Sequence, residues 1–193
     1  MNIFKKIFGL KRKIEYTPQK EAKGTPLPSE DLFVEQFKSK GGKFLYTDDA
    51  QEILVFLKNI IKENHWSSVK CFDKELLDKL NVVSIDVDQN ASVFFTKCEH
   101  LLADEGSILF SSNQIKEEPL RQYPKYFIVY ATTSQLIANK DHALTSIKFK
   151  YRHNLPTNIS AVKDYNPGKS DPGFLNYGNT NAKDLYLLLF EDL

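Results

Sequence analysis

Cysteine is scarce in this chain of 193 residues, which contains only Cys71 and Cys98. The two cysteines lie far apart and form no Cys-x-x-Cys, so cysteine alone supplies no disulfide framework and no ligand set for zinc or an iron–sulfur cluster. The four histidines share no HxxxH or HExxH spacing. We therefore expect no metal site, no bound cofactor and a reduced, cytoplasmic location.

Long apolar runs, phosphate-binding motifs and an excess of one charge are also missing. No window approaches the run of roughly 20 apolar residues that a membrane-spanning helix needs, and the N-terminus lacks the continuous apolar core of a signal peptide. No Gly-x-Gly-x-x-Gly or Walker motif indicates a dinucleotide or ATP. With 26 basic and 25 acidic side chains, the formal net charge of +1 gives no reason to expect a nucleic acid partner.

The N-terminal segment differs from the rest of the chain. Residues 1–13 contain five basic side chains and no acid, with apolar residues at helical spacing. Such a segment could form a short amphipathic helix on anionic lipid or on a partner protein, or it could be a frayed, solvated start. A polar linker with three prolines follows. We expect a tail and linker over 1–28 and one folded domain over 29–193.

The domain alternates predicted helices and strands. Helical periodicity covers roughly 30–39, 49–65 and 73–81, and apolar strand-like runs lie at 43–46, 68–72 and 82–86. The second half predicts strands at 91–96, 107–112, 126–132, 157–162 and 184–192, a short helix or turn at 97–104 and a helix over 133–148. This alternation favours a single α/β domain with a mainly parallel sheet. The long Gly- and Pro-rich segment 163–183 indicates a functional or mobile loop.

Three stretches resemble the lactate-utilisation (LUD) domain family, in particular lactate utilisation proteins of the B and C type. They are VFFTKCEHLLADEGSILFSS, LRQYPKYFIVYATTSQLI and KDLYLLLFED. The matching positions are Thr96, Ala103, Asp104, Gly106 and Ser107, then Pro124 with Phe127, Ile128 and Val129. The resemblance implies a fold similar to the sugar-phosphate isomerase and CoA-transferase superfamily, with ligands where strand ends meet turns. It also implies a role beside iron–sulfur redox subunits in the oxidation of L-lactate to pyruvate.

Two departures from the family pattern bear on the site. Larger members carry Gly-Pro-Ser-x-Thr-Ala-Asp-Ile-Glu before the final strand, whereas this chain has ISAVKDYNPGKSDPGFLNYGNT. Glu105 stands where the family often has Thr. The ligand chemistry of larger relatives is therefore not carried over to this chain.

The sequence around Gly106 has two interpretations. Asp104 and Glu105 are the candidate catalytic carboxylates, because a carboxyl group pressed against another or against apolar surface has a raised pKa. Gly106 would allow the close backbone approach that lets N–H groups hold an anion, with Ser107 beside it. The alternative is a plain turn into a core strand. An enzyme similar to the CoA-transferase superfamily would require Asp104 or Glu105 to face a pocket.

Polar residues follow three of the predicted strands. If those strands are parallel, their ends meet at one edge, where open α/β sheets bind ligands. Hydroxyls and amides there suit a small anion, with Lys97, Lys116 and Arg121 adding positive charge. Strand ends are also polar simply because the chain must turn. The candidate ligand-binding residues are Thr96, Lys97, Gly106, Ser107, Ser111, Ser112, Asn113, Thr132 and Thr133.

Two functional hypotheses follow. The first is a LUD-like cytoplasmic subunit or accessory factor in the oxidation of L-lactate to pyruvate. The second is a non-catalytic module that binds a small anion or a protein, with contact to a membrane or partner through residues 1–13. Whether the chain catalyses any reaction stays open at this point.

Overall fold

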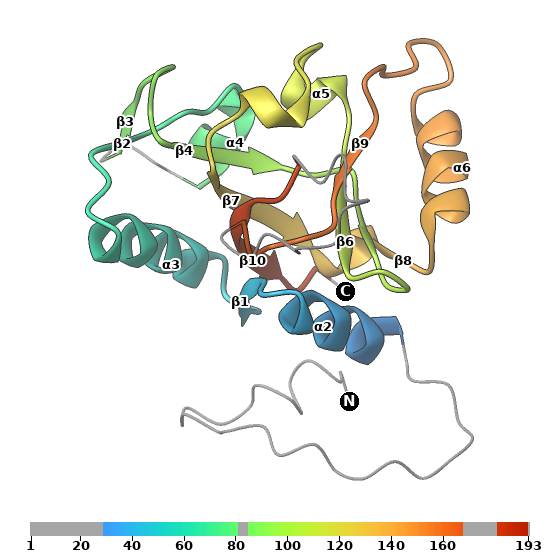
Figure 1. Ribbon diagram of the computed structural model, residues 1–193, viewed down its shortest axis with the longest axis horizontal. Coiled ribbons are helices and arrows are strands. Elements are labelled where there is room, and N and C mark those ends of the chain that lie inside the picture. Colours follow the sequence, from blue (N-terminus) through green and yellow to red (C-terminus); the bar gives the residue numbers. More distant parts are fainter. Residues whose placement is uncertain (1–28, 81–84, 168–180, 193) are drawn as a thin grey trace, which may run out of the picture.

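Parallel strands form the main sheet of the computed structural model, which describes residues 29–80, 85–167 and 181–192 (Figure 1). The strand order is β1-β10-β7-β4, with every neighbouring pair parallel. Their bounds are β1 Lys43–Thr47, β10 Asp184–Phe190, β7 Tyr126–Thr132 and β4 Val93–Lys97. This arrangement confirms the predicted α/β class. The expectations for 1–28 and most of 163–183 lie outside the described residues.

Both faces of the main sheet are buried, which explains why β7 and β10 are almost wholly apolar. Side chains alternate between the faces along each strand. Phe127 and Val129 of β7 face one apolar cluster, whereas Ile128 and Tyr130 face the other. A run such as YFIVYAT therefore suits a central strand.

Helix α3 (Ala50–Glu63) covers one face of the main sheet together with α4 (Lys74–Lys79). Ile53 and Leu57 of α3 and Leu76 of α4 are fully buried against the sheet. Aspartates cap both helices, since Asp49 accepts from the backbone N–H of Gln51 and Asp73 from that of Leu76. Two short parallel strands, β2 (Ser68–Val69) and β3 (Asp86–Val87), lie beside this layer.

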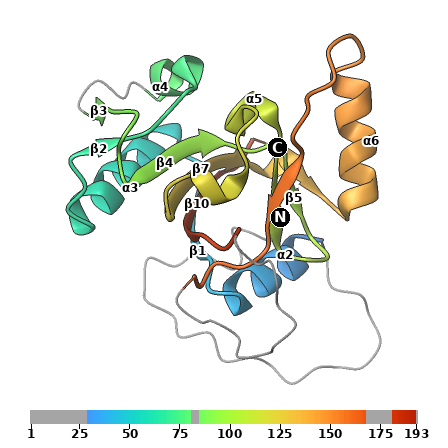
Figure 2. The same cartoon turned by 45° about the horizontal axis from the view of Figure 1, so that its top comes forward.

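The opposite face packs on α2 (Ser29–Ser39) and on a second sheet with the order β8-β5-β6-β9. The strands of this second sheet are β8 Leu136–Ile137, β5 His100–Leu102, β6 Ser107–Phe110 and β9 Ser160–Val162. Helix α6 (Lys140–Lys150) covers its outer side, where Ala143 and Ile147 pack on Leu102 and Leu109. Figure 2 shows α3 and α6 at opposite ends of the layered molecule.

Two predicted elements are wrong in detail. The short helix or turn predicted at 97–104 contains β5, which pairs with β6 and β8. The helix predicted over 133–148 begins only at Lys140, because Asn139 caps it and the preceding residues form a 3-10 turn (η2, Thr133–Gln135) and β8. In both cases pairing with distant residues overrides the local pattern.

Gly106 has a conformational role in the turn between β5 and β6. Its φ is +57°, and a Cβ atom there would lie 2.4 Å from the backbone N of Phe37 in α2. The close approach of α2 therefore requires glycine at this position. Among the helices that the structure describes, none is long and apolar enough to cross a membrane.

Candidate functional site

A buried carboxylate, Glu99, lies between the end of β4 and the start of β5 and is only 1% exposed. The segment that follows β6 supplies three donors to it. Ser111 Oγ lies 2.7 Å, Asn113 Nδ2 3.1 Å and Gln114 Nε2 3.0 Å from Glu99 Oε1. Helix α5 (Ser112–Ile115) positions Asn113 and Gln114, and Ser111 caps that helix.

The end of α6 supplies two further groups to Glu99. Tyr151 Oη donates to Oε2 at 3.0 Å, and Lys150 Nζ lies 3.5 Å from the same oxygen. Burial disfavours the charged form, but the hydrogen bonds from Gln114, Ser111 and Asn113, helped by Lys150, outweigh it and hold the pKa of Glu99 below its ordinary value. Glu99 is therefore an ionised interior carboxylate at neutral pH.

The residues after β7 join the same region. Gln135 donates through Nε2 to the carbonyl oxygens of Cys98 at 2.6 Å and Glu99 at 3.2 Å. Its Oε1 accepts from the backbone N–H of Thr132 at 2.8 Å. The ends of β4, β6 and β7 therefore meet around Cys98 and Glu99, and β6 reaches this point from the second sheet.

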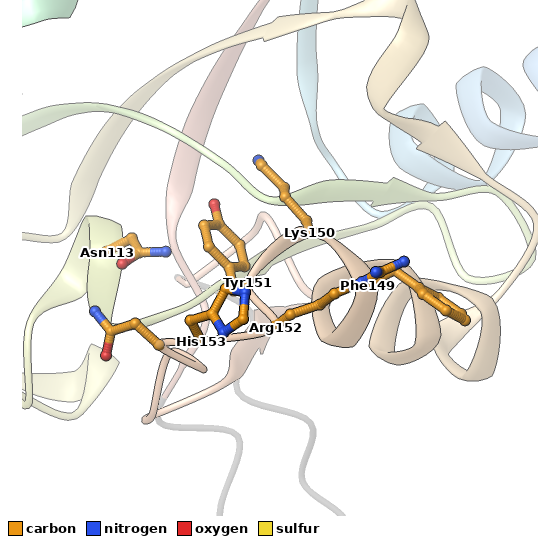
Figure 3. Close-up of a pocket in the computed structure, with 7 residues that line it drawn as sticks. Asn113, Phe149, Lys150, Tyr151, Arg152 and His153 are labelled. Atoms are coloured by element: carbon orange, nitrogen blue, oxygen red, sulfur yellow. The ribbon is translucent and has the colours of Figure 1, made fainter.

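A shallow depression of about 420 Å³ adjoins Glu99 (Figure 3). It is lined by Asn113, Phe149, Lys150, Tyr151, Arg152, His153 and Asn154. Asn113, Lys150 and Tyr151 also contact Glu99, so the Glu99 partners form part of the lining. Lys150 and Arg152 are cations at neutral pH, and the amides of Asn113 and Asn154 can donate hydrogen bonds. The lining residues contain no acid, so the depression is suited to an anion.

The exposed side chain of Phe149 forms one end of this depression, with 64% of its surface accessible. The guanidinium of Arg152 lies 5.6 Å from the centroid of the Phe149 ring. Figure 3 shows Phe149 and Arg152 extending together along α6, away from Tyr151. The cation–π contact orients Arg152 without neutralising its charge.

The two predicted catalytic carboxylates lie elsewhere. Asp104 is exposed in the turn between β5 and β6. Glu105 forms an ion pair with Lys163 at 2.8 Å, and this contact lowers its pKa. Neither lines the depression, and the Glu105 carboxylate is already held by Lys163. The geometry favours the plain-turn interpretation of this stretch.

The predicted ligand-binding residues on the main sheet are occupied by protein contacts. Thr96 is buried and donates to the carbonyl of Lys97, whose Nζ pairs with Asp73 at 2.9 Å. Thr133 Oγ1 donates to Asp192 at 3.0 Å, and Thr132 Oγ1 lies 2.9 Å from Ser134 Oγ. This edge of the sheet is therefore acidic and hydrogen-bonded within the protein.

The residues predicted near β6 divide into two groups. Gly106 and Ser107 belong to the β5–β6 turn, where Ser107 Oγ donates to Glu105 at 3.2 Å. Ser112 Oγ accepts from the backbone N–H of Thr157 at 3.0 Å. Ser111 and Asn113 contact Glu99, and Asn113 also lines the depression. Ligand binding by any of these residues stays a prediction.

Sequence reasoning missed Glu99 and the basic end of α6. The available signals were an acid two residues after an apolar strand and the run KFKYRHN at 148–154, which places basic side chains at a helix end.

His100, beside Glu99, is also unusual. Its Nδ1 lies 3.3 Å from the carbonyl of Gln135, while its Nε2 is buried with no hydrogen-bond partner among the described residues. Burial lowers the pKa of His100 and raises that of Cys98.

Within the described ranges, no three His, Cys, Asp or Glu side chains lie close enough together to hold a metal ion.

No protein-family model matches this sequence, and no curated protein matches it. The fold is similar to that of a DUF162 family protein from Deinococcus radiodurans, with a TM-score of 0.60 and 12% sequence identity over 86% of this chain and 99% of that chain. DUF162 is the LUD-domain family, so the resemblance to this family holds at the level of the fold.

Proposed function

We propose that this chain is a LUD-like domain that binds a small carboxylate anion in the depression beside Glu99. We further propose that it acts as a subunit or accessory factor in the oxidation of L-lactate to pyruvate. The observation that carries the proposal is the pairing of Lys150 and Arg152 with amide donors in a depression whose lining contains no acid. A carboxylate there would gain charge-assisted hydrogen bonds from Arg152, while the charge of Lys150 is shared with Glu99.

The geometry favours binding over catalysis. Glu99 accepts from four side chains and lies beside Lys150, so its oxygens are already occupied. A general base needs to reach the proton that it removes, and Glu99 is 1% exposed. In this proposal, electrons from lactate pass to iron–sulfur subunits, and this chain contributes a binding or positioning surface. The wide mouth of the depression leaves room for a second subunit to complete the site.

A protein-interaction module is the second candidate function. Phe149 is 64% exposed and Leu155 54%, and in the sequence they lie on either side of the basic lining residues Lys150 and Arg152. Large exposed apolar side chains beside a polar rim are typical of interaction sites. In this version the same surface contacts a partner protein, and residues 1–13 add a further contact to a partner or membrane.

Calorimetric titration of the purified full chain with L-lactate and with pyruvate tests the proposal. We expect Arg152→Gln to weaken carboxylate binding about tenfold, because the ligand loses a charge-assisted contact worth ~1.4 kcal/mol. Lys148→Gln is the matched control, since Lys148 is exposed in the last turn of α6, four residues before Arg152, and does not line the depression. Equal affinities for wild type and Arg152→Gln, or no binding of either anion at millimolar concentration, would contradict the proposed function.

A further inference from the structure

An apolar groove of about 370 Å³ lies between the edge strand β1 and helix α3. Figure 1 shows β1 between α3 and α2 at this edge of the main sheet. The apolar lining comes from Phe44 and Leu45 of β1, Phe56 and Ile60 of α3, and Tyr186 of β10. Leu45, Phe56 and Tyr186 pack against the core on this face and are nevertheless only half-buried. The groove therefore leaves part of the apolar cluster under α3 open to water.

Val55 extends this apolar surface along α3. Its side chain is 52% exposed, and it lies one helical turn before Asn59 of the groove. The helix thus presents apolar surface both inside the groove and beside it. Continuous exposed apolar surface of this kind marks an interaction site rather than an ordinary solvated face.

The charges at the rim of the groove are not balanced. Lys43 pairs with Asp184 at 2.6 Å, and its Nζ lies 4.3 Å from the centroid of the Tyr186 ring. Glu63 is exposed and forms no ion pair with any residue that the structure describes. The rim therefore carries one acid whose charge is not neutralised, next to an apolar floor. Such a surface is complementary to a basic amphipathic segment.

The chain itself contains a segment of this chemistry. Residues 1–13 carry five basic side chains and no acid. In a helix, Ile3, Phe4, Ile7 and Phe8 would share one face, which is the spacing of the anchors that a helix inserts into an apolar groove. Its lysines would then be available to Glu63.

The length of the connection puts the groove within reach of this segment. Residues 14–28 connect it to α2, and a stretch of that length spans up to roughly 50 Å when extended. Helix α2 is roughly 16 Å long, and only residues 40–42 separate it from β1. A tether of this kind gives an effective concentration in the millimolar range, well above that of a second copy in a micromolar solution. The chain's own segment is therefore the favoured occupant.

We propose that the N-terminal segment, residues 1–13, docks as an amphipathic helix in the groove between β1 and α3. Its apolar face packs on Phe56 and Tyr186, and its basic side chains face Glu63. This inference goes beyond the proposed function and does not depend on carboxylate binding. In this arrangement the apolar face of the segment is covered by the same chain.

Hydrogen exchange of the full chain, followed by mass spectrometry, tests the docking. We expect the amides of residues 3–10 to exchange about fivefold more slowly in wild type than in Phe4→Asp. At an effective concentration of about 1 mM, a Kd of ~0.25 mM keeps about 80% of the segment docked, which gives this factor. Asn2→Asp is the matched control, because it changes the charge equally on the opposite side of the helix. Equal exchange in wild type and Phe4→Asp would overturn the proposal.

A second variant tests the groove from the side of the folded domain. Asn59→Lys combined with Glu63→Lys places two cations at exposed positions of the groove, so we expect the slow exchange of residues 3–10 to be lost. Gln51→Lys combined with Glu35→Lys makes the same charge change at exposed positions outside the groove and should leave it unchanged.

Three further outcomes of these measurements would overturn the proposal. Slow exchange that survives in the groove variant would place the segment elsewhere. Slow exchange that increases with protein concentration would identify a second copy as the occupant. Slow exchange that arises only with vesicles of phosphatidylglycerol would assign the segment to an anionic membrane surface.

Discussion

Two regions of this molecule hold carboxylates at strand ends, and they differ in which charge faces solvent. At the carboxyl edge of the main sheet, Glu52 accepts a hydrogen bond from Thr47 and Asp73 pairs with Lys97. Asp192 accepts a hydrogen bond from Ser134. At the Glu99 cluster, a single carboxylate is enclosed by donors, and cations form the outer layer. In the first region the hydroxyl groups donate to the carboxylates, and the carboxylates lie on the solvent side. The second is basic outside.

The difference shows why the polar ends of parallel strands do not by themselves define an anion site. Thr133 and Ser134 have the hydroxyls that an anion would need, yet Asp192 already occupies both. Burying an acid behind the surface has the opposite effect, since Glu99 orders Tyr151 and Lys150 at the edge of a depression. The position of the carboxylate, inside or outside, decides the character of the site.

Replacing the two acids with leucine should give the largest contrast. Glu99→Leu would leave the buried hydroxyl of Ser111 and the partly buried donors of Gln114 and Tyr151 without the acceptor that they share, so we expect a loss of about 2–3 kcal/mol in unfolding free energy. Asp192→Leu exposes its former donors to water and should cost less than about 1 kcal/mol. Urea denaturation followed by circular dichroism measures both. Similar losses for the two variants would remove the distinction between an interior and an edge carboxylate.

The pH dependence of stability should separate the regions near neutral pH. Burial, together with Lys150, lowers the pKa of His100 in the folded state, so the unfolded chain takes up a proton first as the pH falls. Stability should therefore decrease as the pH drops below about 6.5, which is the ordinary value for histidine. His100→Phe should flatten that part of the curve.

The carboxylates act in a lower pH range. The pKa values of both Glu99 and Asp192 are below their ordinary values in the folded protein, so their contribution to stability is full above about pH 4.5 and is lost as the pH falls further.

Urea denaturation of wild type and His100→Phe at pH 7.5, 6.5 and 5.5 isolates the contribution of His100 to stability. Parallel curves for the two proteins would show that His100 does not titrate differently in the folded state.

The smallest effect is expected at the edge of the main sheet. Lys97→Ala removes the ion pair with Asp73, whose side chains are 35% and 29% exposed. Partly exposed pairs contribute little, so we expect a change below about 1 kcal/mol and no change in carboxylate affinity. Thermal unfolding and the same calorimetric titration check both points. Weakened carboxylate binding in Lys97→Ala would move the site back to this edge.

Much of the fold could be predicted from local patterns. The apolar run at 126–132 and the stripe of Ile53 and Leu57 need only the period of side chains to be recognised as a central strand and a covering helix. The strand β5 could not be recognised, because three residues carry little periodicity and its partner Leu136 is distant in sequence. The start of α6 at Lys140 is not predictable locally either, because the residues before it form β8 by pairing with the distant β5.

The candidate site was predictable only in part. The predicted meeting of three polar strand ends depends on parallel strands, but β6 lies in the second sheet and pairs antiparallel with β5 and β9. Ser111 therefore contacts Glu99, whereas Thr133 contacts Asp192. The sequence did not indicate that an acid would lie at the centre, because a lone Glu after a strand is usually solvated. The contribution of Tyr151 depends on how α6 crosses the second sheet.

The sequence by itself determined the α/β class, the buried central strands and the helix caps, because these depend on side-chain periodicity and on hydrogen bonds between near neighbours. The tertiary structure alone decided which acid is interior. Glu99 and Asp104 are both carboxylates beside a strand of the same sheet, yet one meets donors from α5 and α6 and the other meets water. That difference arises from tertiary packing, because the donors to Glu99 come from residues 12 to 52 positions further along the chain. No local sequence pattern predicts that such distant residues meet.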